Sequence, residues 1–137
     1  AIAQAVLAYE AFQTTFSGPR WEALAQRGAQ VQRPLWASTS TKNAAYPDTL
    51  YVDQLIGPDS VNTLPDATVD AFADHGTVSR TIDIDIGQAH ADWRSLQMIG
   101  IDMEEVAQKL EREGVASFQK SFTELIEALT EKAQQFR

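Results

Sequence analysis

The chain has 137 residues, the usual length of one domain, and 44% of them are apolar, which is enough to build a packed core. Its formal net charge of -8 argues against nucleic acid and anionic membranes as partners, whereas a small anion needs only a local group of donors. The absence of cysteine excludes disulfides, thiolate metal sites and cysteine nucleophiles. There is no apolar run near the ~20 residues that cross a bilayer and no signal-peptide pattern, so we expect a cytoplasmic protein.

Residues 1–33 are expected to be helical. Ala1–Phe16 is rich in alanine, with apolar side chains at helical spacing. A second, short helix is predicted over Trp21–Arg27, with Gly28 where a left-handed residue commonly ends a helix. The chain opens without methionine and without a helix cap, a start that either processing or a longer parent protein would produce.

Two short strands, each followed by a helix, are predicted in the next part of the chain. Leu35–Ser38 is the first strand candidate, behind Pro34, and Ser60–Leu64 is the second. Helices are expected over Thr49–Ile56 and Ala67–Asp74. The strands begin roughly 25 residues apart, near the ~31-residue average for one unit of an eightfold barrel. Two units cannot close a barrel, which needs about eight strands.

Polar residues and glycines mark the expected ends of these helices. Asp48 and Asp66 stand where N-caps are expected. Gly57 with Pro58, and Gly76, stand where the helices should stop.

The remainder, residues 77–137, is expected to be mainly helical. Thr81–Ile86 alternates polar and isoleucine residues and fits a half-buried strand, although alternation over six residues is a weak signal and leaves this open. Helical spacing follows from Gly87 and ends at Gly100.

Two further helices are predicted after Gly100. The first begins at a capping box, with Asp102 as cap and Glu105 reaching back to its amide, and ends at Gly114. The second, Val115–Phe136, carries one apolar stripe against a charged remainder.

The loop Ser38–Asn43 is the main candidate binding site. At the C-terminal end of a barrel strand, its hydroxyls and amides would donate to a phosphate group, and Lys42 would supply a point charge. A solvated loop with an ordinary surface lysine is the alternative, and spacing alone favours it. Asn62 and Thr63 either face the same mouth or pair with neighbouring backbone.

Other polar and aromatic residues have structural interpretations. His75 lies at a helix C-terminus, where the helix dipole favours an imidazolium. His90 has no second ligand at metal-binding spacing, so no metal site is expected. Asp83 and Asp85 are expected to point to water, and Trp36 to belong to the core.

The sequence Trp-Ala-Ser-Thr-Ser-Thr-Lys-Asn within Arg33–Val52 resembles the corresponding strand end of bacterial transaldolases. The resemblance continues through Ser60–Pro65, Ala71–Gly76, Gly100–Asp102 and Leu110–Val115. It spans nearly all of the chain.

This resemblance implies an α/β fold, the C-terminal part of a (β/α)8 TIM barrel followed by a helical tail. Leu35–Ser38 would be the seventh strand and Val61–Leu64 the eighth, adjacent and parallel. All of 1–137 would then be the C-terminal segment of a single TIM-barrel domain: 1–33 helices after barrel strand six, 34–76 the last two βα units, and 77–137 the helical C-terminal part.

The family transfers a dihydroxyacetone unit from sedoheptulose 7-phosphate to glyceraldehyde 3-phosphate in the pentose phosphate pathway. It works through a lysine Schiff base, without cofactor or metal. Ser38 and Lys42 fall where the family places phosphate-binding groups, and Asn43 matches the asparagine beside the basic residue. Many members have arginine where this chain has Lys42, which implies a point-charge contact rather than a bidentate one.

The strands that would carry the Schiff-base lysine and its two helping acids precede Ala1. We therefore expect no catalytic residue in this segment, which alone would be inactive and would need the N-terminal part of the same enzyme. Sugar phosphates would be the substrates. The alternative is a free-standing helical interaction module without catalysis, whose apolar stripes bind a partner.

Overall fold

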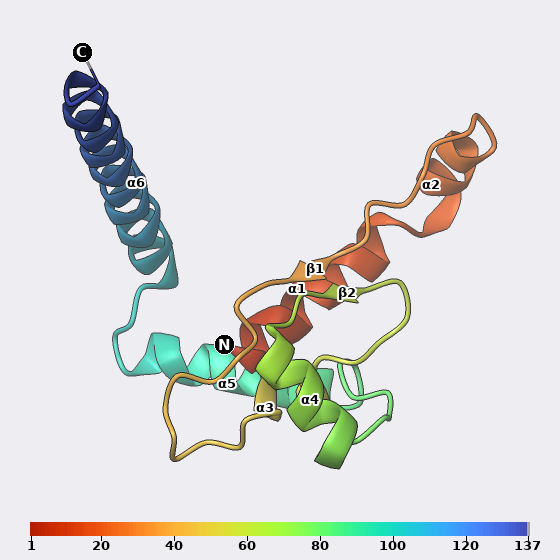
Figure 1. Ribbon diagram of the computed structural model, residues 1–137. Helices are drawn as coiled ribbons and strands as arrows, with labels where there is room; N and C mark the ends of the chain where they lie inside the picture. The colour runs from red at the N-terminus through yellow and green to blue at the C-terminus, as the bar shows by residue number, and fades with distance from the viewer. Residues whose placement is uncertain (137) are drawn as a thin grey trace. The chain divides into compact units, whose positions relative to one another are not determined.

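The structure is a computed structural model that describes residues 1–136 (Figure 1). It divides into two compact units, one covering residues 1–95 and one from residue 96 onward. Its elements follow the predicted order, with two short strands among helices: α1 (Ile2–Thr15), α2 (Gly18–Ala25), β1 (Leu35–Trp36), α3 (Leu50–Gln54), β2 (Val61–Asn62), α4 (Asp66–His75), α5 (Ile86–Met98) and α6 (Met103–Gln134).

The two strands are adjacent and parallel, which confirms their predicted pairing (Figure 1). Leu35 lies opposite Val61, and Trp36 lies opposite Asn62. Both strands are shorter than predicted. The first ends early because the backbone of Ser38 has a φ of 58°, in the left-handed region, which is incompatible with extended structure.

The core of the first unit lies between α1, the segment after α3, and α5. It is formed by Val6, Tyr9, Leu55, Ile82 and Ala89, and Ile82 is completely buried. The Tyr9 hydroxyl donates a 2.8 Å hydrogen bond to the carbonyl oxygen of Pro58. This bond satisfies the one polar atom of a side chain that otherwise supplies apolar area.

The alternating segment Thr81–Ile86 is not a strand. It forms turns that lead into α5, and its isoleucines differ in environment, since Ile82 is fully buried whereas Ile84 is 74% exposed. The backbone amides of Thr81 and Ile82 both donate to the carbonyl oxygen of Ile56, at 2.9 and 3.1 Å. A single carbonyl therefore takes the place of the neighbouring strand that a ladder requires.

One of the two aspartates expected to point to water does not. The Asp83 side chain is only 11% exposed, and its carboxylate accepts hydrogen bonds from Arg80 Nε at 2.8 Å and from Gln13 Nε2 at 3.3 Å. The Arg80 guanidinium holds the pKa of Asp83 below its usual value. Asp85 is exposed and accepts a bond from the Gln88 amide.

The predicted caps differ in outcome. Asp102 caps α6 as expected, accepting hydrogen bonds from the amides of Glu104 and Glu105. Asp48 and Asp66 make no cap hydrogen bond: α3 begins at Leu50, and Asp66 is already the first residue of α4. The prediction failed for Asp48 because its carboxylate is bound to a histidine distant in sequence, described below.

The predicted break at Gly114 is also absent. α6 runs through this residue as one helix of 32 residues. A glycine inside a helix costs only about 1 kcal/mol, and the many strong helix formers around it outweigh that cost. Gly28, by contrast, has a φ of 91° and follows α2, as predicted for a left-handed residue after a helix.

Candidate functional site

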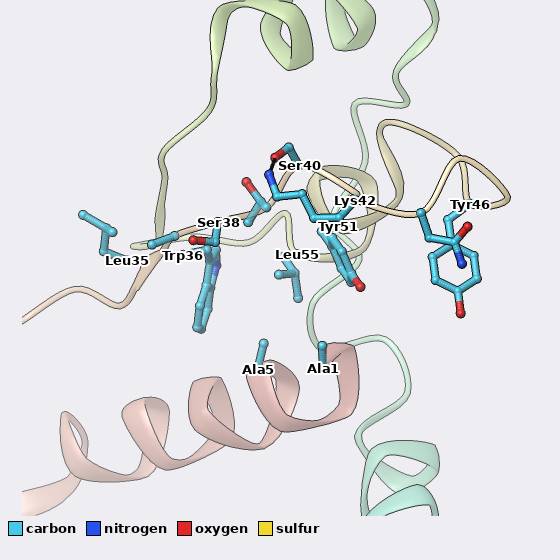
Figure 2. Close-up of a pocket in the computed structure, with 13 residues that line it drawn as sticks. Ala1, Ala5, Leu35, Trp36, Ser38, Ser40, Lys42, Tyr46, Tyr51 and Leu55 are labelled. Atoms are coloured by element: carbon cyan, nitrogen blue, oxygen red, sulfur yellow. Dashed lines mark hydrogen bonds between the residues drawn. The ribbon is translucent and has the colours of Figure 1, made fainter. Parts of the chain in front are cut away.

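A cavity of about 490 Å³ opens at the C-terminal end of β1 (Figure 2). Figure 2 shows Ala1 and Ala5, at the start of α1, on one side of this cavity, with Trp36 and Leu55 as apolar residues on the opposite side. The loop of residues 38–43, which we call the rim loop, continues from β1 on the same side as Trp36. Ser38, Lys42 and Asn43, the three residues predicted to bind phosphate, all line this cavity.

The rim loop presents hydrogen-bond donors. The Lys42 ammonium donates a 2.6 Å bond to the Ser40 hydroxyl, and Figure 2 shows the two side chains turned toward each other. An ammonium carries three N–H donors, so two remain for a ligand. The Asn43 carboxamide oxygen accepts a bond from the Ala45 amide, which leaves its NH₂ group as a donor.

The backbone turns sharply at the start of the rim loop. Ser38 adopts the left-handed conformation that is uncommon for a residue with a side chain. The next residue, Thr39, is then only 4% exposed, whereas Ser38 itself is exposed. Backbone in such a region costs of order 1–3 kcal/mol and is often found at ligand sites, where surrounding contacts hold it.

Asn62 and Thr63, at the end of β2, form hydrogen bonds with neighbouring residues and do not line the cavity. The Thr63 hydroxyl donates to the carbonyl oxygen of Trp36 at 3.0 Å. The Thr39 hydroxyl donates to Asn62 Oδ1 at 2.8 Å and lies 3.2 Å from the carbonyl oxygen of Thr63. Of the two interpretations left open by the sequence, the structure favours pairing with neighbouring groups.

Two kinds of residue around this cavity are not predicted by the sequence pattern. Thr39 stands in a row of similar hydroxyl residues, and only the left-handed turn at Ser38 sets Thr39 apart. Tyr46 and Tyr51 also line the cavity. Both lie within the stretch that resembles transaldolase, which was the available signal.

Trp36 is half-buried and packs against the core, as expected. Its indole Nε1 is buried, and among residues 1–136 it has no hydrogen-bond partner. An unmet buried donor costs about 1–3 kcal/mol. Because this nitrogen is buried, the indole borders the cavity with its apolar ring atoms.

The two histidines lie outside the cavity. His75, the last residue of α4, contacts Asp48 through Nε2 at 2.9 Å and Asp74 through Nδ1 at 3.1 Å. Hydrogen bonds to Asp48 and then Asp74 raise the pKa of His75, and the bond from His75 lowers the pKa of Asp48. His90 contacts Glu10 of α1 at 2.8 Å.

Within residues 1–136 there is no cluster of three or more histidine or carboxylate side chains arranged to hold a metal ion. In the same part of the chain, none of the helices combines the length and the apolar character needed to cross a membrane.

Comparison with known proteins matches this chain to one protein family and to several members of it. Residues 1–129 match the family described as transaldolase/fructose-6-phosphate aldolase. The chain is 52% identical over 133 residues to a transaldolase of Parafrankia sp. (strain EAN1pec), covering 96% of this chain and 36% of that protein. It is 48% identical over 138 residues to a transaldolase of Acidothermus cellulolyticus, covering 100% of this chain and 37% of that protein.

A similar relationship holds for transaldolase 1 of Streptomyces avermitilis, which is 49% identical over 130 residues. The chain spans about a third of the length of these relatives. The family match covers the rim loop, both strands and most of α6. The chain therefore belongs to the transaldolase/fructose-6-phosphate aldolase family.

Proposed function

We propose that residues 1–137 are the C-terminal segment of a transaldolase of the pentose phosphate pathway. The complete enzyme would move a dihydroxyacetone unit from sedoheptulose 7-phosphate to glyceraldehyde 3-phosphate through a lysine Schiff base. In this proposal the segment supplies the phosphate-binding rim and the last two strands of a (β/α)8 barrel. The Schiff-base lysine belongs to the N-terminal part of the same enzyme.

One observation carries the proposal. Ser38, Lys42 and Asn43 line a single cavity at the C-terminal end of β1, in a chain of the transaldolase family. Substrates of (β/α)8 enzymes bind at the C-terminal ends of the strands, often with a phosphate held by the loops after strands seven and eight. An ammonium, hydroxyls and an amide NH₂ are suitable donors for a phosphate dianion.

The barrel assignment is supported by the strands themselves. β1 and β2 are parallel, and Leu35 of β1 is 55% exposed although parallel strands are normally covered on both faces. Additional strands and helices of a barrel would cover this residue. The apolar stripe of α6 gives no separate support to an interaction module, because the family match includes that helix as far as residue 129.

The surroundings of Lys42 support a contact with phosphate rather than the role of the Schiff-base lysine. A nucleophilic amine needs desolvation or a neighbouring group that lowers its pKa. Lys42 is exposed, and its ammonium donates to a serine hydroxyl. A phosphate group approaching the rim loop would meet this ammonium as a point charge.

Borohydride reduction of the complete enzyme with fructose 6-phosphate tests the proposal. We expect a covalent adduct whose mass equals that of a reduced dihydroxyacetone Schiff base, because glyceraldehyde 3-phosphate leaves when the sugar is cleaved, and we expect peptide mapping to locate it outside residues 1–137. The Lys42→Met variant should still form the adduct at saturating sugar. No adduct in the wild-type enzyme, or an adduct on Lys42, would refute the assignment.

A further inference from the structure

Thr39 differs from every other residue of the rim loop in its burial. It is 4% exposed, while its neighbours Ser38 and Ser40 are exposed and half-buried. Thr39 borders the cavity, but its hydroxyl hydrogen is directed to β2, where it is donated to Asn62 Oδ1 at 2.8 Å. A ligand in the cavity would therefore meet the neighbours of Thr39 rather than its hydroxyl.

The Thr39 side chain hydrogen-bonds to β2 just beyond the point where the backbone pairing of the two strands ends. The last backbone bond between them runs from the Thr63 amide to the carbonyl oxygen of Trp36, at 3.0 Å. Two residues later the left-handed turn at Ser38 removes the rim loop from the extended path. The contacts of Thr39 with Asn62 and with the Thr63 carbonyl oxygen then join the loop to β2.

The same contacts account for the conformation of Ser38. A serine in the left-handed region is held there only when surrounding contacts outweigh its strain. Thr39 is the adjacent residue, its branched side chain has few rotamers, and its hydroxyl is held by β2. The backbone is thus held immediately after the strained residue and immediately before Ser40, the partner of Lys42.

We propose that Thr39 is a positioning residue of the anion-binding rim, whose hydrogen bond to Asn62 orders Ser38, Ser40 and Lys42 around a phosphate group. This inference rests on the proposed function, because it assumes that the rim loop binds the phosphate of a sugar. Thr39 itself acts through its neighbours and makes no bond to the ligand.

Thr39→Val, which keeps the shape and removes the hydroxyl, tests the proposal in the complete enzyme. Loss of the buried hydrogen bond should weaken phosphate affinity about 10-fold. We expect the KM for fructose 6-phosphate and the inhibition constant of inorganic phosphate to rise together by this factor. kcat, and kcat/KM with unphosphorylated dihydroxyacetone, should change less than about 2-fold.

Three further single variants and one double variant separate positioning from general stability. Thr39→Ser keeps the hydroxyl and should restore the KM for fructose 6-phosphate. Thr68→Val removes the hydroxyl of another buried threonine, in α4, and should leave the KM for fructose 6-phosphate and the KM for dihydroxyacetone unchanged. Asn62→Ala should reproduce the Thr39→Val effect, and the double variant should be no worse than the more impaired single variant.

Failure of the positioning role and failure of the proposed function give different results. If the wild-type enzyme forms the Schiff base and Thr39→Val leaves the KM and the phosphate inhibition constant unchanged, the positioning role is wrong. Equal losses with phosphorylated and unphosphorylated substrates would also overturn it. If Thr39→Val does not fold, the same kinetic measurements on Asn62→Ala test the positioning role. A wild-type enzyme without Schiff base would refute the transaldolase assignment itself.

Discussion

His75 and Asp48 join the end of α4 to the segment that follows the rim loop. The imidazole Nε2 lies 2.9 Å from the Asp48 carboxylate, and the two residues are 27 positions apart in the sequence. Asp74 contacts the other ring nitrogen, so a protonated imidazole can donate to a carboxylate from each side. This contact uses the carboxylate that the sequence pattern assigned to a helix cap.

The first prediction concerns pH. The pKa of His75 is raised from 6.5 in the folded protein, so its stabilising contribution is complete below about pH 6.5 and is lost as pH rises through the higher folded value. The pKa of Asp48 is lowered from 3.8, so its contribution is present above that pH and is lost as pH falls through the lowered value. The pair therefore stabilises the fold most between these limits.

We expect His75→Gln to lower Tm more at pH 5.5 than at pH 9, as measured by thermal unfolding at constant ionic strength. Asp70→Asn, on the same helix, is the control for removal of an exposed charge. A difference between wild type and His75→Gln that is the same at both pH values would contradict the prediction.

The second prediction concerns Lys42 in the complete enzyme. Lys42→Met keeps most of the side-chain length and removes the charge, which costs a charge-assisted hydrogen bond of about 1.5–3 kcal/mol. The KM for fructose 6-phosphate should rise roughly 10- to 100-fold, with little effect on dihydroxyacetone. Lys42→Arg should retain most of the affinity because the positive charge remains. Steady-state kinetics with both substrates measure this, and equal losses on the two would rule out a phosphate contact.

The third prediction concerns Gly57 in the core. A Cβ at this position would overlap Ile82 Cγ2 and would lie 3.4 Å from the Tyr9 ring. Because Ile82 is completely buried and cannot move away, Gly57→Ala should destabilise the protein by about 1–3 kcal/mol in urea unfolding.

Two variants check the cause of that loss. In the background of Ile82→Ala, which removes the overlapping atom, the added cost of Gly57→Ala should be smaller. Gly87→Ala, in helix α5, places a Cβ only in ordinary contact with Asp85 and should be neutral or stabilising. An unchanged cost of Gly57→Ala in the Ile82→Ala background would show that the overlap is not responsible.

The fourth prediction concerns Gly114 inside α6. Beyond the adjacent residues and the backbone of its own helix, an added Cβ would meet no atom within 4 Å, so alanine at this position gains helix propensity without a clash. Gly114→Ala should stabilise the protein by about 0.5–1 kcal/mol, and Ala116→Gly in the same helix should destabilise it by a similar amount. Thermal unfolding followed by circular dichroism measures both, and a loss of stability in Gly114→Ala would contradict a continuous helix.

Local sequence patterns were sufficient for the order of the elements, although they predicted a break at Gly114 that is absent, whereas the family resemblance pointed to the rim loop as a candidate site. Helical spacing identified the helices, because each depends mainly on side chains three and four residues apart. Asp102 was recognised as a cap because its partners, the amides of Glu104 and Glu105, are its near neighbours. The motif around Lys42 likewise placed the rim loop directly after a strand, where the structure has it.

Those patterns failed where a residue of another element binds the same polar group. Asp48 was expected to cap α3 and instead binds His75, and Asp83 was expected to face water and instead binds Arg80 and Gln13. The alternation of Thr81–Ile86 fitted a half-buried strand and left that open, and the structure has turns there, with the amides of Thr81 and Ile82 bonded to the carbonyl oxygen of Ile56.

The amino-acid sequence by itself determined the family and the residues of the rim loop, because these follow from a contiguous motif, and the family resemblance implied the parallel pair of strands. Only the tertiary structure decided which hydroxyl of that loop is buried. The left-handed backbone at Ser38 directs Thr39 to Asn62, a partner 23 residues away, and no local pattern specifies a hydrogen bond over that separation.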